Sequence, residues 1–143
     1  MKIRKMIIAD YQAVYGLWSN TPGMGMRNVD DSKEGIEKYI KRNPKTCFVA
    51  EVENKIVGVI LSGHDGRRGY IYHTAVSNTT RKQGIGTKLV NTAIRALKEQ
   101  GINKVALVAF ETNKLGNSFW KSQGFEERND LVYRNKSLND DNV

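Results

Sequence analysis

Apolar positions near the start of the chain change from strand spacing to helix spacing. Residues 2–8 alternate charged and apolar side chains, which predicts a first strand. Val14, Leu17 and Trp18 then fall on one face of a predicted helix, and Asp10 stands where it can cap that helix. The chain should therefore open as a strand followed by an amphipathic helix.

A second helix is bounded by residues that typically start and stop helices. Asp31 or Ser32 can open it, and Asn43-Pro44 should end it because the residue before a proline disfavours the α region. Between these limits the apolar residues recur at helical spacing, at Ile36, Tyr39 and Ile40.

The middle of the chain has the pattern of three successive strands. Residues 46–52 and 56–62 are joined by a short polar turn and should form a hairpin. Residues 70–76 are rich in aromatic and branched side chains, which favour strands.

The last third begins with a helix and continues with a strand. Gly84 should start the helix and Gly101 should end it, and between them one apolar stripe is formed by Leu89, Ala93, Ala96 and Leu97. A strand is predicted over residues 104–110, and Asn113 should cap a short helix that ends at Gly124.

After that helix, residues 125–128 and 131–136 look like a final hairpin. The polar tail 137–143 should fray. The predicted order favours an α/β (α+β) fold with a mixed, mostly antiparallel central sheet and helices on both faces. The 143 residues fit one domain over residues 1–136 followed by the tail.

Composition excludes several classes of protein. The longest apolar stretch, residues 56–61, is too short to span a bilayer, and the first nine residues lack the apolar core of a signal peptide. The only cysteine, Cys47, lies within a predicted strand and indicates a core residue, so no intramolecular disulfide or multi-cysteine zinc site can form. We therefore expect a cytoplasmic protein without a metal or a membrane partner.

The formal charge of +8 invites a nucleic-acid interpretation. However, lysines and arginines are interleaved with acids, and no block of five like charges occurs. A solvated basic surface is the favoured interpretation, and attraction of an acidic substrate or of cofactor phosphates is the next. Nucleic acid is not expected as the main partner.

The most informative stretch joins the predicted strand 70–76 to the helix that follows it. Arg81 and Lys82 precede Gly84 and Gly86 at the predicted start of that helix. Free backbone N–H groups at a helix N-terminus bind phosphate, and glycines allow a bulky phosphate to approach. A dinucleotide fingerprint fails because Leu89 stands where the third glycine is needed, and no Walker A sequence occurs.

These residues resemble the GCN5-related N-acetyltransferase (GNAT) family over about residues 2–136. The family signature Gln/Arg-x-x-Gly-x-Gly/Ala is matched by Arg81, Gly84 and Gly86. A second family feature is an Asn followed by a large aromatic residue and then Gly-Phe, matched here by Asn113, Trp120, Gly124 and Phe125. The strand residues 72–76 also look like the strand that carries the family's cofactor.

The resemblance implies an acetyl-CoA-dependent amine N-acetyltransferase in which the neutral amine attacks the thioester directly, in a ternary complex. The backbone of Thr74, Ala75 and Val76 would pair with the pantetheine amides, and an N–H there could hold the oxyanion. Arg81 lies beside the residues that would surround the pyrophosphate, which are Lys82, Gln83, Gly84, Ile85, Gly86 and Thr87. Asn113 would bond the pantetheine arm, and Trp120 would lie beside the cofactor.

The chain departs from the family pattern at its acid and base. Many relatives have a tyrosine where this chain has Trp120, and an indole N–H is not a practical proton source. Trp120 as a packing residue is the favoured interpretation. His73 has a pKa range suited to a base, but strand alternation would put it on the face opposite Tyr72 and Thr74. Tyr72 and His73 are the catalytic candidates, although packing would explain both.

The acceptor is not determined by the sequence. In the family the loop after the first helix shapes the acceptor cleft, here around residues 21–31. Small-molecule and peptide amines both remain open, as does a homodimer. The alternatives to an enzyme are an acyl-CoA-binding module without turnover and a basic nucleic-acid adaptor.

Overall fold

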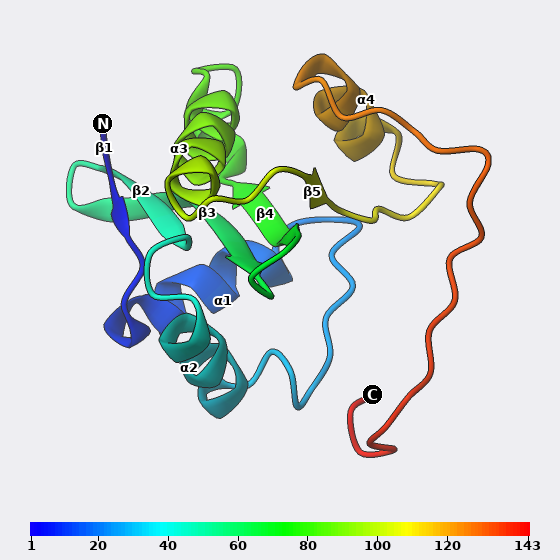
Figure 1. The fold of residues 1–143 in the computed structure, drawn as a ribbon. Coiled ribbons are helices and arrows are strands. Elements are labelled where there is room, and N and C mark those ends of the chain that lie inside the picture. The colour runs from blue at the N-terminus through cyan, green and yellow to red at the C-terminus, as the bar shows by residue number, and fades with distance from the viewer.

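The computed structural model describes all 143 residues and has a five-stranded sheet at its centre (Figure 1). The strands lie in chain order, β1 (Lys2–Lys5), β2 (Phe48–Val52), β3 (Lys55–His64), β4 (Gly69–Val76) and β5 (Val105–Ala106). The first four are antiparallel to their neighbours, whereas β5 runs parallel to β4. The predicted mixed, mostly antiparallel sheet is confirmed.

Helices cover both faces of the sheet, as expected (Figure 1). One apolar cluster joins the strands to α1 (Tyr11–Ser19) and α2 (Lys33–Arg42), with Trp18 almost fully buried. The other joins them to α3 (Ile85–Glu99). The short helix α4 (Lys114–Ser122) follows β5 and packs against the α3 side through Phe119 and Trp120.

The start of each of the first two helices is fixed by a different polar contact. Ser32 caps α2, where its hydroxyl accepts from Gly35 N–H at 3.0 Å. Asp10 precedes α1 but makes no capping bond to that helix. Its carboxylate instead accepts two bonds of 2.8 Å from Arg4 on β1, which outcompete the local cap.

Strand β4 contains a bulge that sequence alternation does not predict. Its register with β3 shifts between Val59 and Leu61, and His73 opposite that gap has a positive φ of 38°. The extra residue reverses the alternation, so the prediction that His73 faces away from Tyr72 is wrong. The His73 ring lies on the α1 side, 5.2 Å from the Trp18 ring and 6.4 Å from the Tyr72 ring.

The end of the sheet differs from the sequence prediction. The strand predicted over residues 104–110 is confined to β5, whose pairing with β4 ends at Ala106. The final hairpin over 125–136 is absent: these residues form no strand, and an isolated two-stranded hairpin is only marginally stable. Several apolar residues in these segments are exposed, among them Val108, Phe110, Leu131, Val132 and Tyr133.

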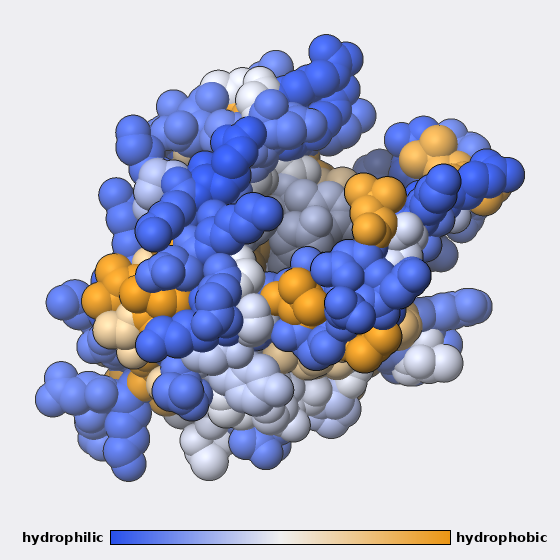
Figure 2. Space-filling view, turned by 90° about the horizontal axis from the view of Figure 1, so that it is seen from below, coloured by the Kyte–Doolittle hydropathy of each residue, from blue (hydrophilic) through white to orange (hydrophobic).

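The tail is better held than expected, and the prediction that it frays is wrong at its end. Asn142 accepts from the N–H groups of Val29 and Asp30, and Val143 N–H donates to Asn28 at 2.6 Å. The C-terminus therefore lies against the loop that precedes α2. Seen from below, the surface is mostly hydrophilic, with small, separated apolar areas (Figure 2). No helix has the length and apolar character needed to cross a membrane.

Candidate active site

One edge of β4 is open for most of its length. β5 pairs with β4 only at Gly69 and Tyr70, so residues 71–76 have a strand neighbour on the β3 side alone. This stretch includes the predicted cofactor residues Thr74, Ala75 and Val76. An extended segment with amide groups can add to such an edge as a further strand.

The open edge leads directly to a loop suited to phosphate. Gly84 precedes α3 in the left-handed conformation, with φ of 75°, and no side chain caps the helix. The first turn of α3 carries no acidic residue, so its N–H groups and helix dipole face no competing carboxylate. Arg81 and Lys82 are exposed beside this terminus, as are Gln83 and Thr87, whereas Ile85 is buried.

Helix α4 lies close to the same terminus. A Cβ atom on Gly86 would meet the Phe119 ring at 3.2 Å, which shows how closely α4 approaches. Gln123, after α4, donates to the Thr87 hydroxyl at 3.0 Å. The structure thus brings the two segments that carry the family-like motifs into contact.

Asn113 and Trp120 both have structural partners. The Asn113 side chain caps α4 by accepting from Gly116 N–H at 3.0 Å, as predicted. Trp120 is partly buried between Phe119 and Phe125, with ring centroids at 5.0 Å and 5.2 Å. The packing interpretation of Trp120 therefore has direct support.

The predicted acceptor loop reaches the segment that leads into α4. A Cβ on Gly23 would touch the Asn113 side chain at 2.9 Å, and one on Gly25 would meet the Phe110 ring at 3.2 Å. Residues 21–31 therefore run beside Asn113 while their other end approaches β4 at His73.

Tyr72 lies on the α2 side of β4 within a group of tyrosines. Its ring is 4.6 Å from the Tyr70 ring and 5.8 Å from the Tyr39 ring, yet the residue is 46% exposed. Burial, followed by nearby Tyr133 and Asp30, raises the pKa of Tyr72. The hydroxyl is therefore protonated at neutral pH and is a weaker acid than an exposed tyrosine.

His73 is held in a cluster of long-range contacts. Its Nε2 lies 2.8 Å from Oδ1 of Asp31, a carboxylate with only 7% of its side chain exposed. The indole N–H of Trp18 donates to the His73 carbonyl at 2.8 Å. From the sequence, Asp31 was expected to open a helix and to end the acceptor loop, but no local signal could connect residues 42 positions apart.

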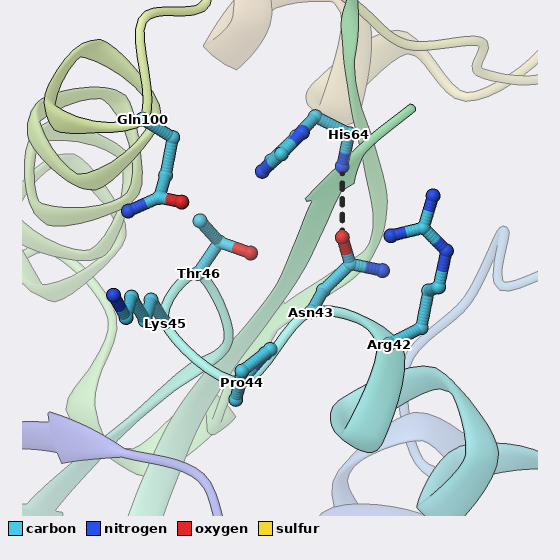
Figure 3. A pocket seen from close by; sticks show the side chains of 7 residues that line it. All are labelled: Arg42, Asn43, Pro44, Lys45, Thr46, His64 and Gln100. Carbon is cyan, nitrogen blue, oxygen red and sulfur yellow. Dashed lines mark hydrogen bonds between the residues drawn. The ribbon is translucent and has the colours of Figure 1, made fainter. Parts of the chain in front are cut away.

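A separate hollow of about 150 Å³ lies at the other end of α3. In it the His64 and Gln100 side chains extend toward each other above Thr46 (Figure 3). The hollow is lined by Arg42, Asn43, Pro44, Lys45, Thr46, His64 and Gln100. It contains none of the predicted site residues, and α3 separates it from the Gly84 loop by about 22 Å.

An open strand edge that ends at a helix N-terminus is an arrangement suited to an extended, phosphate-bearing ligand. The acetyltransferase (GNAT) family model matches residues 11–125. An acetyltransferase of Pectobacterium atrosepticum is 33% identical over 113 residues, which are 79% of each chain. This chain therefore belongs to the GNAT acetyltransferase family.

Solved structures share the fold. One is an aminoglycoside acetyltransferase from an uncultured soil metagenomic sample, determined in complex with trehalose, with a TM-score of 0.72, 25% identity and 96% of both chains covered. Another is a predicted acetyltransferase from Clostridium acetobutylicum with acetyl-CoA, with a TM-score of 0.67, 21% identity, and 94% of this chain and 95% of that chain covered.

Proposed function

We propose that the protein is an acetyl-CoA-dependent N-acetyltransferase that acts on a primary amine. The observation that carries this proposal is the free β4 edge, which runs from the His73 bulge to the Gly84 loop. A pantetheine arm has two amides and can add to this edge as a strand does, with its pyrophosphate at the start of α3. Its thioester would then lie near the bulge.

Each predicted cofactor residue has a role in this arrangement. Thr74, Ala75 and Val76 offer backbone groups to the pantetheine amides. Arg81 supplies positive charge beside the pyrophosphate, which would be surrounded by Lys82, Gln83, Gly84, Ile85, Gly86 and Thr87. The side-chain oxygen of Asn113 already caps α4, so the side-chain N–H₂ is the group left for the pantetheine arm. Trp120 borders the site as an apolar wall.

The proposed reaction is direct attack of the neutral amine on the thioester carbon within a ternary complex. Holding the two reactants together supplies much of the rate. A β4 backbone N–H near the bulge would stabilise the oxyanion. Tyr72, whose raised pKa keeps it protonated, is the proposed donor to the leaving thiolate.

The acceptor is proposed only as a class. The soil-metagenome relative is named for aminoglycosides, which are polyamines, so a small polyamine is the first acceptor to test. Peptide N-termini offer the same nucleophile and belong in the same experiment.

Calorimetry with acetyl-CoA, followed by detection of free thiol over a panel of amines, tests the proposal. We expect binding, and thiol release that depends on both the amine and the enzyme concentration. Absence of binding at millimolar acetyl-CoA would refute the proposal. Binding without thiol release on any amine would instead favour an acyl-CoA-binding module, for which the lack of a tyrosine at Trp120 is the argument. Affinity for RNA or DNA that persists at physiological salt would favour a nucleic-acid adaptor.

A further inference from the structure

We propose that Asp31 is a positioning residue that makes His73 the general base for the acceptor amine. This inference rests on the proposed acetyl transfer and adds to it the residue that receives the amine proton. Its basis is the contact between His73 and Asp31, two residues far apart in sequence that meet where the open β4 edge begins.

The contact fixes the protonation of the His73 ring. A carboxylate can only accept a hydrogen bond, so the Nε2 that lies 2.8 Å from Asp31 Oδ1 carries the proton. In a neutral imidazole the other nitrogen, Nδ1, then holds the free lone pair. Nδ1 has no hydrogen-bond partner within the chain. Only one fully buried side-chain N or O atom lacks such a partner, and it is Ser62 Oγ. Nδ1 is therefore not fully buried and retains some exposed surface.

Both members of the pair are held in place by other groups. The second oxygen of Asp31 accepts from Arg27 N–H at 2.7 Å, and its carbonyl accepts from the Tyr11 hydroxyl at 2.6 Å. On the other side the Trp18 indole N–H holds the His73 carbonyl. His73 keeps a positive φ that costs about 1–3 kcal/mol in a residue other than glycine, and such strain often marks a functional site.

The location suits a base. The phosphate loop follows the C-terminal end of β4, so a cofactor arm that begins there and runs back along the edge ends at the bulge. Asp31 belongs to the loop that is expected to contact the acceptor. His73 therefore lies between the end of the cofactor site and the acceptor loop, where the amine must lose its proton.

A substrate ammonium group gives one proton to His73 Nδ1 and becomes a neutral amine. The amine lone pair forms a C–N bond with the thioester carbon, and the C–S bond then breaks with its electron pair on sulfur. Tyr72 gives its proton to the thiolate and regains one from the amine nitrogen, giving the amide and CoA thiol, and His73 returns its proton to solvent. Asp31 stabilises the imidazolium throughout.

Two variants separate a catalytic role from a structural one. His73→Gln keeps an N–H donor for Asp31 but has no titratable nitrogen, so kcat should fall by about 10²–10⁴-fold with acetyl-CoA affinity unchanged. Asp31→Asn keeps the shape and removes the charge that favours the imidazolium. It should change the acidic limb of the kcat/KM profile, which a merely structural role would not move.

The control is Asp30→Asn, the adjacent exposed acid, whose carboxylate bonds Asn142 and not His73. It should leave the acidic limb in place. Three titratable groups lie around His73: Asp31 in the loop before α2, Tyr72 on the same strand as His73, and Tyr11 on α1. The Tyr11 hydroxyl bonds the backbone carbonyl of Asp31 and not the His73 ring. Neither tyrosine titrates in the acidic range, because the pKa of each is raised.

NMR of the His73 ring nitrogens, without substrate, gives a readout independent of turnover. At pH 8 the ring proton should lie on Nε2, with Nδ1 unprotonated, in the wild type and in Asp30→Asn. A His73→Gln variant with wild-type kcat, or a wild-type ring protonated on Nδ1, would overturn the inference even if the wild type is an active acetyltransferase. A wild type that turns over no amine would refute the proposed function instead, and the NMR spectrum would still decide which nitrogen of His73 is free.

Discussion

Valine in place of Gly84 should weaken acetyl-CoA binding at least tenfold, which corresponds to about 1.4 kcal/mol. The residue precedes α3 with φ of 75°, and a Cβ there would meet nothing within 4 Å in the protein. The added side chain would therefore project into the space above the helix N-terminus that we assign to the pyrophosphate. It would also cover the N–H groups that we propose bind the phosphate.

The backbone strain of this substitution needs a matched control. Valine at a left-handed position costs about 1–2 kcal/mol or more wherever it occurs. Gly101, just after α3, has φ of 78° and equally open surroundings, but it lies at the opposite end of the helix. Gly101→Val should therefore lower the unfolding free energy by a similar amount and leave acetyl-CoA affinity within twofold of the wild type.

Calorimetry for affinity and urea unfolding for stability, on both variants, complete the test. Domains of this size have about 5–15 kcal/mol of stability, so both variants should fold. Unchanged affinity in a folded Gly84→Val protein would refute the assignment of the loop. An equal loss of affinity in Gly101→Val would show that strain, and not occupation of the phosphate site, caused the effect.

Three further predictions concern other parts of the chain. Trp120→Phe keeps an apolar ring without the indole N–H and should lower turnover less than tenfold, the scale of one neutral hydrogen bond. Tyr72→Phe should lower turnover by about 10²–10⁴-fold, with acetyl-CoA affinity intact, if the Tyr72 hydroxyl protonates the thiolate. Burial alone would raise the pKa of Asp10, but the bonds from Arg4 and Ile7 N–H outweigh it and lower the pKa. The folded-state pKa of Asp10 thus lies below the unfolded value of about 3.9. The stabilisation is therefore present above the unfolded pKa and is lost as the pH falls through the folded-state pKa. Asp10→Asn should reduce the unfolding free energy by about 1–3 kcal/mol at pH 7 and by little at pH 2. Cys47 is buried and its thiol pKa is raised to about 12, so a thiol reagent at pH 8 should label it only in denaturant.

Much of the fold could be predicted from local patterns, because the elements concerned bury their own apolar stripes. The Leu89 and Ala93 stripe of α3 and the Ser32 cap of α2 are sequence features that the structure retains. The glycine-rich start of α3 was also readable, since a left-handed residue before a helix requires glycine or strain. The final hairpin was not, because two paired strands are stable only when they join a sheet or pack on a helix, and residues 125–136 form no strand in this structure.

The sequence by itself determined the family of the protein, the glycine-rich start of α3 and the strand that leads to it. Those features are local, since they depend on backbone freedom at Gly84 and on positive charge a few residues away. Only the tertiary structure decided the face on which His73 lies, because one extra residue in β4 reverses strand alternation and no single-strand pattern encodes it. Only the tertiary structure paired His73 with Asp31 and Trp18, because those contacts form when a loop and a helix pack against the bulge.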